Sequence, residues 1–178
     1  NATPTGYLTT VLDAEGNQTA TLVASGSNRK YVTLDEIPKD LQHAFVAIED
    51  ERFYEHNGID IQGILRAGIK GIASGFHFKE GASTITQQLL KNTVFTDWVS
   101  EESLADKFER KFQEQYLALQ LEKIVDKDWI LENYLNAINL GQNTLGVGVA
   151  SKRYFGKDVS ELNLSECAVL AAITKSPS

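Results

Sequence analysis

The spacing of apolar residues changes at Pro38 from a strand-like to a helical pattern, and this change constrains the fold more than any other feature. Residues 1–34 contain two short β-type runs, YLTTVLD and TATLVA, separated by the turn signal AEGN. Such runs around a turn favour a short hairpin. From Pro38 onward, apolar residues recur at helical spacing, first at Leu41, Ala44, Phe45 and Ile48. We therefore predict a mainly α fold over residues 35–178, preceded by a β-type segment or linker over residues 1–34.

Further helices are predicted along the rest of the chain. Asp60 is a suitable N-cap for a short apolar helix that carries Ile61, Ile64, Leu65, Ile69 and Ile72. The longest pattern runs from Leu104 to Lys123, and the side expected to face the core holds Leu104, Phe108, Phe112 and Leu119. Three more helices are predicted in DKDWILENYLNAINL, around VGVASKRYFGK and in LSECAVLAAIT. The last of these opens with a capping box of Asn163 and Glu166.

Charge and composition narrow the possible functions. The chain has 17 basic and 24 acidic residues, a net charge of −7, which argues against a broad electrostatic surface for nucleic acid. No uninterrupted apolar run approaches the ~20 residues that a transmembrane helix needs. The single cysteine, Cys167, has apolar neighbours and is expected to be a small core residue.

Glu49 is the first candidate catalytic residue. In AFVAIEDERFYEHNGID, helical spacing would place Phe45, Glu49, Phe53 and His56 on one side of a helix. A carboxylate at the edge of an apolar stripe loses solvation, which suits it to proton transfer. The alternative is an ordinary surface glutamate, and spacing alone favours that alternative. His56 is better explained as a capping residue, and three histidines without a nearby cysteine give little support to a zinc site.

Two later segments carry polar and charged residues at helical spacing. EGASTITQQLLKN places small and hydroxyl residues before a helix that contains Lys91, an arrangement that suits either an anion or plain capping by Ser83. In FERKFQEQYLALQLEK, Arg110 and Lys111 precede Glu114 by four and three residues. Spacing alone favours an exposed salt bridge of ~0.3–0.5 kcal/mol over a phosphate-binding pair beside a second carboxylate.

Taken in order, EDERFYEHNG, GASTITQQLLKN, RKFQE and KDWILENYLN resemble the peptidoglycan glycosyltransferase family, the transglycosylase domains of class A penicillin-binding proteins and of monofunctional transglycosylases. The similarity runs from about Val32 to Ser178. It implies a lysozyme-like helical fold with a large lobe and a small membrane-facing jaw lobe at about residues 60–82. It also implies polymerisation of lipid II, in which the 4-hydroxyl of one lipid II attacks the anomeric carbon that joins the growing glycan to undecaprenyl pyrophosphate, with inversion.

The resemblance also implies roles for individual residues. Glu49 matches the general base, and Glu114 matches a second glutamate that helps to stabilise the pyrophosphate, through neighbouring cations or a divalent ion such as Mg²⁺ or Mn²⁺. No other cofactor is implied. The matching substrate-binding or structural residues are Asp50, Phe53, His56, Ser83, Thr84, Gln87, Gln88, Lys91, Asn92, Arg110 and Lys111. The residues that match the jaw are Ile64, Leu65, Ile69, Ile72, Phe76 and Phe78. They would insert into lipid, although the isoleucines could instead pack in the core.

The implied partners are lipid II, the growing glycan, a membrane surface and other cell-wall synthesis proteins, with no nucleic acid. The implied location is the outer face of the bacterial cell membrane, with a transmembrane anchor outside this sequence. Three departures from the family pattern stand out. Ala82 replaces a frequent glycine, Lys107 is the cation available where members often carry an arginine, and the chain stops before the family's last motif.

Two other functions remain open from the sequence. A lysozyme-like enzyme that cleaves glycosides would use Glu49 as general acid and Glu114 as its partner. Such an enzyme has no need for Lys91, Arg110 and Lys111 around one site. A non-catalytic helical module would leave Glu49 and Glu114 apart after folding.

Overall fold

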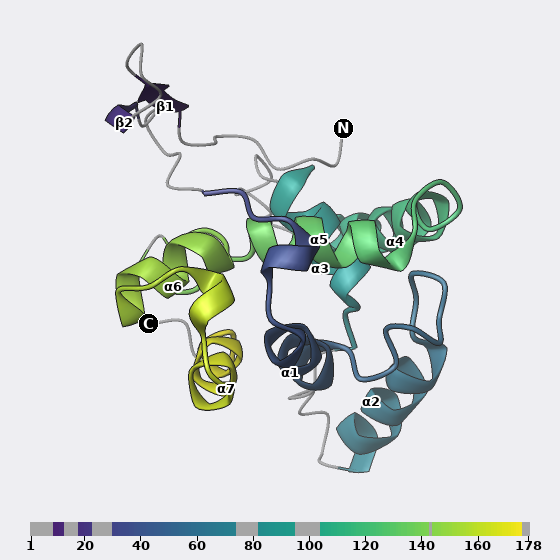
Figure 1. Cartoon of the computed structure of the whole chain (residues 1–178). Helices are drawn as coiled ribbons and strands as arrows, with labels where there is room; N and C mark the ends of the chain where they lie inside the picture. Colours follow the sequence, from purple (N-terminus) through teal and green to yellow (C-terminus); the bar gives the residue numbers. More distant parts are fainter. Residues whose placement is uncertain are drawn as a thin grey trace.

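The computed structural model describes the backbone of residues 9–12, 18–22, 30–73, 82–94, 104–142 and 144–175. The helices are α1 (Lys39–Glu49), α2 (Ile61–Ala73), α3 (Ile85–Thr93), α4 (Leu104–Leu121), α5 (Lys127–Ala137), α6 (Val147–Phe155) and α7 (Leu164–Ile173), with short 3-10 helices η1 (Leu34–Glu36) and η2 (Val159–Glu161). Two short strands, β1 (Thr9–Leu12) and β2 (Gln18–Leu22), pair antiparallel. The predicted mainly α fold is confirmed (Figure 1).

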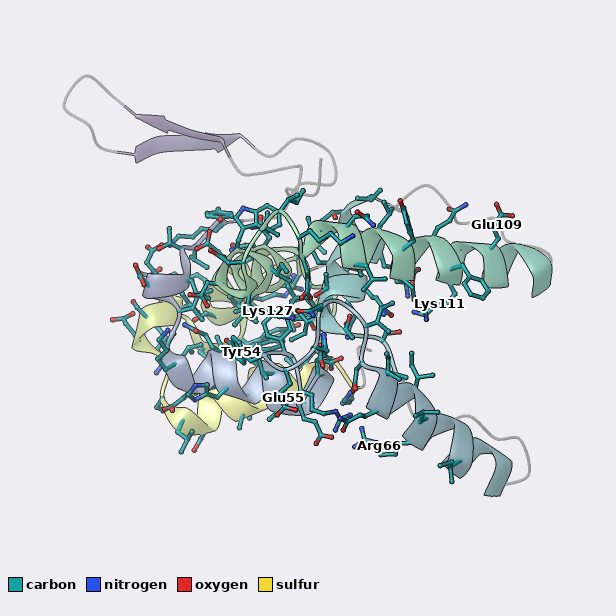
Figure 2. All side chains as sticks on the ribbon, turned by 90° about the vertical axis from the view of Figure 1, so that its right-hand side faces the viewer. Tyr54, Glu55, Arg66, Glu109, Lys111 and Lys127 are labelled. Carbon is teal, nitrogen blue, oxygen red and sulfur yellow. The ribbon has the colours of Figure 1, made fainter. Side chains whose placement is uncertain are left out.

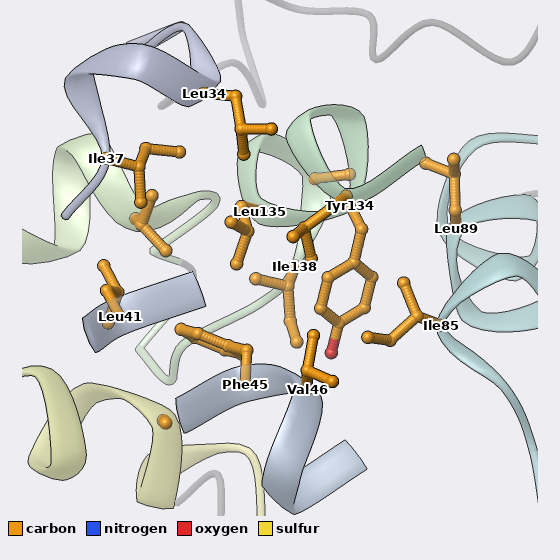
Figure 3. Close-up of a cluster of buried hydrophobic side chains, with 14 of the residues drawn as sticks. Leu34, Ile37, Leu41, Phe45, Val46, Ile85, Leu89, Tyr134, Leu135 and Ile138 are labelled. Atoms are coloured by element: carbon orange, nitrogen blue, oxygen red, sulfur yellow. The ribbon is translucent and has the colours of Figure 1, made fainter. Parts of the chain in front are cut away.

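The core forms where α1, α3 and α5 meet (Figure 3). Phe45 of α1 and Tyr134 of α5 are fully buried, and their rings meet edge to face with centroids 6.2 Å apart. Ile85 and Leu89 of α3 are also fully buried in this cluster. Burial of each such side chain stabilises the fold by about 1.5–3 kcal/mol. The packing holds the end of α1 beside the start of α3.

Helix α1 ends earlier than the helical spacing predicted. Asp50 has φ −159° and ψ 74°, which are not helical values, and residues 51–55 form turns. Phe53 and His56 therefore do not continue the helical face of Glu49, and this part of the prediction is wrong. Phe53 instead turns inward and is fully buried. The exit of the chain from α1 leaves Glu49 at the helix end.

The predicted core face of α4 is also wrong. Phe112 is 69% exposed and Leu119 is 38% exposed, whereas Glu114 and Ala118 are buried. A side chain on Gly58 would lie 2.7 Å from the Ala118 backbone, so this close approach and the φ of +93° both require glycine. The side chains of Leu104 and Phe108 lie outside the described residues. Helix α4 therefore turns Glu114 and Ala118 toward the protein, and Phe112 toward solvent.

Helix α2 extends away from the core on the same side of the molecule as α4 (Figure 2). Asp60 accepts a hydrogen bond from the Gly63 backbone at 2.9 Å, as expected of the predicted N-cap. The exposed fractions are 67% for Ile61, 61% for Leu65 and 69% for Ile69. Phe76, Phe78 and the side chain of Ile72 lie outside the described residues. Within the described ranges, no helix combines the length and apolarity required to span a bilayer.

Candidate active site

Two cavities of about 430 Å³ each meet at Glu49 and Ser83, which line both. The first, called here the Glu114 cavity, is lined by Glu49, Ser83, Gln87, Gln88, Lys91, Asn92, Arg110, Lys111 and Glu114. The second, called the Arg66 cavity, has among its lining residues Glu49, Asp60, Arg66, Ser83, Thr84 and Lys175. The fold thus brings the two candidate carboxylates to one cavity, which argues against the module in which they would lie apart.

Glu114 lies on α4 with its side chain only 3% exposed. Lys111 Nζ donates to Glu114 Oε2 at 2.9 Å and to Ser83 Oγ at 2.8 Å. Arg110 Nε lies 3.3 Å from Glu114 Oε1 as an ion pair without the geometry of a hydrogen bond. An unpaired charge at such a buried position would destabilise the fold, so the two cations and the carboxylate stabilise one another. This group of charges is not the exposed salt bridge that spacing alone favoured.

Glu49 has a different set of neighbours. Its side chain is 9% exposed. Gln88 Nε2 donates to Glu49 Oε2 at 2.9 Å, and Thr174 Oγ1 makes a short contact with Oε1. Lys175 Nζ, on a side chain that is 60% exposed, lies 3.4 Å from Oε1. The carboxylate is thus held mainly by neutral groups, with one solvated cation beside it.

Tyr134 lies behind Gln88 and restricts its orientation. The phenol is fully buried and donates to Gln88 Oε1 at 3.4 Å. Burial, with a smaller effect from the carboxylates of Glu49 and Asp50, raises the pKa of Tyr134 well above its ordinary value. The hydroxyl therefore stays protonated. A donor at Oε1 of Gln88 leaves the amide nitrogen directed at Glu49.

Asp50 and His56 connect the end of α1 to the start of α3. The Asp50 carboxylate accepts hydrogen bonds from the Ile85 backbone at 3.0 Å and from His56 Nε2 at 2.9 Å. The Gly58 backbone donates to His56 Nδ1 at 3.1 Å, so Nδ1 is the acceptor and Nε2 carries the proton. Ile85 begins α3, whose positive end favours a carboxylate. These two residues position the site, and neither lines the Glu114 cavity.

Phe53 and Thr84 also support the site without lining the Glu114 cavity. Phe53 is fully buried, with Lys127 Nζ 4.5 Å from its ring centroid. Thr84 is the N-cap of α3: its Oγ1 accepts from the Gln87 backbone at 3.2 Å and donates to the Gly58 carbonyl at 2.8 Å. The cap is therefore Thr84 and not Ser83. That leaves the Ser83 hydroxyl facing the cavity, in contact with Lys111.

Sequence reasoning missed two residues of the site, Thr174 and Lys175. They follow α7, and Thr174 lies 125 positions from Glu49 along the chain. The packing of α7 against α1 brings them to the carboxylate. Two polar residues after an apolar helix are a weak signal. No local pattern in the sequence indicates which distant residue they contact.

The arrangement does not form a metal site by itself. In the described part of the chain, no group of three or more His, Cys, Asp or Glu is placed to hold an ion. The carboxylate of Glu114 faces Lys111 and Arg110, and positive neighbours disfavour a cation. The donor set present therefore does not fit a protein-held Mg²⁺ or Mn²⁺, which prefer several oxygen ligands.

Comparison with known proteins identifies the family of the chain. The transglycosylase family model matches residues 15–178. Penicillin-binding protein 1A of Clostridium perfringens strain 13 is 52% identical over 158 residues, which are 87% of this chain and 22% of that protein. Penicillin-binding protein 1A of Escherichia coli K12 is 49% identical over 147 residues, 83% of this chain and 16% of that protein. The chain therefore spans about a fifth of the length of such relatives, and it belongs to the transglycosylase family.

Proposed function

We propose that the chain catalyses glycosyl transfer in peptidoglycan synthesis, with lipid II as acceptor and a growing glycan on undecaprenyl pyrophosphate as donor. The single observation that carries this proposal is the Glu114 cavity. It holds two carboxylates: Glu114 faces the two cavity-lining cations Arg110 and Lys111, whereas Glu49 is held by neutral groups and has one solvated lysine, Lys175, at 3.4 Å. Glycosyl transfer from a pyrophosphate needs a base for the attacking hydroxyl and positive charge for the leaving pyrophosphate. Family membership supports the same reaction.

Glu49 is the proposed general base. It lies where the Glu114 cavity and the Arg66 cavity meet, so an acceptor in one cavity can approach a donor in the other. Its carboxylate would accept the proton of the acceptor 4-hydroxyl while that oxygen attacks the anomeric carbon. Gln88 and Thr174 hold the carboxylate in place, which lowers the entropy cost of reaching the reactive geometry.

Lys111, Arg110 and Lys91 are proposed to stabilise the pyrophosphate as it leaves. Glu114 has a supporting part, because its buried carboxylate holds Lys111 and Arg110 at the cavity wall. Lys91, in the last turn of α3, is exposed and adds positive charge at the same cavity. Groups that are already in place when charge develops lower the barrier without having to reorganise.

The lysozyme-like hydrolase is the less favoured alternative. Its leaving group is a sugar hydroxyl, which needs a proton donor and not a cluster of cations. Glu114 would be the partner carboxylate of Glu49, yet its oxygens face Lys111 and Arg110. The charges in the Glu114 cavity are therefore better suited to an anionic leaving group.

The membrane is proposed as the place of reaction, since lipid II and the donor carry long isoprenoid chains. The outer apolar face of α2, with Ile61, Leu65 and Ile69, supports shallow insertion into lipid at the outer face of the cell membrane. With a net charge of −7, attraction to anionic lipid is weak, so apolar contact would supply much of the binding. This region is the proposed jaw.

The test is polymerisation of lipid II by the full-length protein that contains this chain. Incubation with lipid II should give glycan polymer on a gel, and the same protein with Glu49→Gln should give none. Release of soluble muropeptides from existing glycan, without polymer, would instead support the hydrolase.

A further inference from the structure

We propose that Thr174 is a positioning residue for Glu49, whose hydroxyl reverses its hydrogen bond when Glu49 takes up the acceptor's proton. This inference rests on the proposed function, because it assigns a place to the proton at the same carboxylate. It concerns one contact, between Thr174 Oγ1 and Glu49 Oε1, that connects the end of α7 to the end of α1. We place the proton on Oε1 of the carboxylate, and not on Oε2.

Oxygen Oε2 of Glu49 faces a group that only donates. Gln88 Nε2 lies 2.9 Å away, and an amide nitrogen cannot accept a hydrogen bond. Tyr134 donates to the other end of the amide, Gln88 Oε1, at 3.4 Å, and a flipped amide would place that oxygen against the ionised carboxylate. A proton placed between Oε2 and Gln88 would meet the N–H group. Oε2 is therefore placed to accept the hydrogen bond from Gln88 and not to carry the proton.

Oxygen Oε1 faces Thr174, whose hydroxyl lies between two acceptors. Thr174 Oγ1 contacts Glu49 Oε1 and is also 2.8 Å from the carbonyl oxygen of Ala171. A hydroxyl has one proton, so it cannot donate fully to both. When Glu49 is ionised, the hydroxyl donates to Oε1, and the Ala171 carbonyl keeps the bond from the Thr174 backbone N–H at 3.4 Å.

Protonation of Glu49 completes this chain of hydrogen bonds. The proton on Oε1 is donated to Thr174 Oγ1, and the Thr174 proton turns to the Ala171 carbonyl. Each oxygen then has a partner, and no heavy atom has to move. Lys175 Nζ, 3.4 Å from Oε1, is also near, but an ammonium group only donates. Of these three neighbours of Glu49, only Thr174 can both donate and accept.

The position of Oε1 fits the direction from which the proton arrives. Lys175, beside Oε1, lines the Arg66 cavity, whereas Gln88, beside Oε2, lines the Glu114 cavity, where Lys111 and Arg110 are proposed to hold the pyrophosphate. The acceptor is thus placed on the Oε1 side. In the reaction, the acceptor oxygen bonds to the anomeric carbon as the bond from that carbon to the pyrophosphate oxygen breaks. The bonding electrons leave with pyrophosphate, and the hydroxyl proton moves to Glu49 Oε1.

The test compares Thr174→Val, which keeps the shape but removes the hydroxyl, with Thr174→Ser, which keeps the hydroxyl. Both variants are made in the full-length protein and assayed with lipid II. We expect Thr174→Val to lower kcat about 10- to 100-fold with KM changed less than about twofold. The solvent deuterium isotope effect on kcat should rise in Thr174→Val, because proton transfer becomes the slower step. Thr174→Ser should stay within about threefold of the unmodified protein.

The outcomes separate this inference from the proposed function. If the unmodified protein forms no polymer, the proposed function itself fails. If it does form polymer, and Thr174→Val keeps the same kcat and isotope effect, the role of Thr174 is wrong. Equal losses in Thr174→Ser and Thr174→Val would also overturn it, since the hydroxyl would not be what matters. Thr174→Ala, with melting temperatures for all variants, provides a second hydroxyl-free protein should Thr174→Val unfold.

Discussion

Glu49 and Glu114 are the same kind of side chain in one cavity, but their surroundings differ. Glu49 is held by the neutral groups of Gln88 and Thr174, with the solvated Lys175 farther away. Glu114 is more deeply buried, and both of its oxygens face cations, at 2.9 Å from Lys111 and 3.3 Å from Arg110. Neutral groups thus orient Glu49, whereas Glu114 holds two cations at the cavity wall.

Burial alone does not assign a catalytic role to either carboxylate. Both carboxylates are largely removed from water, and only their partners separate a proposed base from a residue that holds cations in place. The comparison predicts that changes on the Glu49 side affect the chemical step. Changes on the Glu114 side should also weaken binding of the pyrophosphate group of the donor.

The largest effect is expected from Glu49→Gln. The amide has nearly the same shape but cannot accept the proton, so polymerisation should fall by about 10²–10⁴-fold or to the limit of detection. Binding of lipid II should stay within a few fold, because Lys111 and Arg110, which are proposed to hold the pyrophosphate, pair with Glu114 and not with Glu49. Gel assays give the rate, and fluorescence titration gives the affinity. Substantial turnover by this variant would remove Glu49 from the role of base.

Lys111→Gln tests the other side of the comparison. The change removes a donor to Glu114 and Ser83, so kcat should fall roughly 10- to 100-fold and the donor should bind more weakly. Lys123→Gln is a matched control, since Lys123 is exposed just beyond the end of α4 and does not line the Glu114 cavity. Equal effects of the two changes would mean that position at the cavity does not matter.

A smaller effect is expected on membrane binding. Ile69→Ser on α2 should weaken binding to vesicles of phosphatidylglycerol and phosphatidylethanolamine by several fold, without lowering the melting temperature. Ile124→Ser is the matched control, because Ile124 is also exposed, at 79%, but lies beyond α4. Co-sedimentation measures both. A loss of stability in Ile69→Ser with unchanged vesicle binding would show that α2 is part of the core and not a membrane face.

The smallest effect concerns the pH dependence of stability. A hydrogen bond from Arg52, with a smaller contribution from the Gly63 backbone, lowers the pKa of Asp60. A lowered pKa means that the stabilisation is present above the unfolded value of ~3.9 and is lost as pH falls through the folded value. Asp60→Asn keeps an N-cap acceptor for α2 but removes the charge. Its melting temperature should be a few degrees lower at pH 7, and the difference should shrink near pH 3. A constant difference at both pH values would contradict the ion pair.

Helical spacing and the order of motifs predicted most of the helices and the residues of the Glu114 cavity. Asn163 and Asp60 cap their helices as expected, because capping depends on neighbours in sequence. The prediction for α4 failed, because spacing shows that Phe112 and Ala118 lie on different sides but not which side is buried. Thr174 was missed because its contact with Glu49 depends on helix packing.

The different roles of Glu49 and Glu114 are tested most directly by the affinity of the protein for an isoprenyl pyrophosphate. This measurement requires no turnover. Farnesyl pyrophosphate can be titrated by calorimetry against Glu49→Gln, Lys111→Gln and the unmodified protein. We expect Glu49→Gln to bind within a few fold of the unmodified protein and Lys111→Gln to bind about tenfold or more weakly. Weak binding by Glu49→Gln together with unchanged binding by Lys111→Gln would show that Glu49, and not the group around Glu114, supports the pyrophosphate.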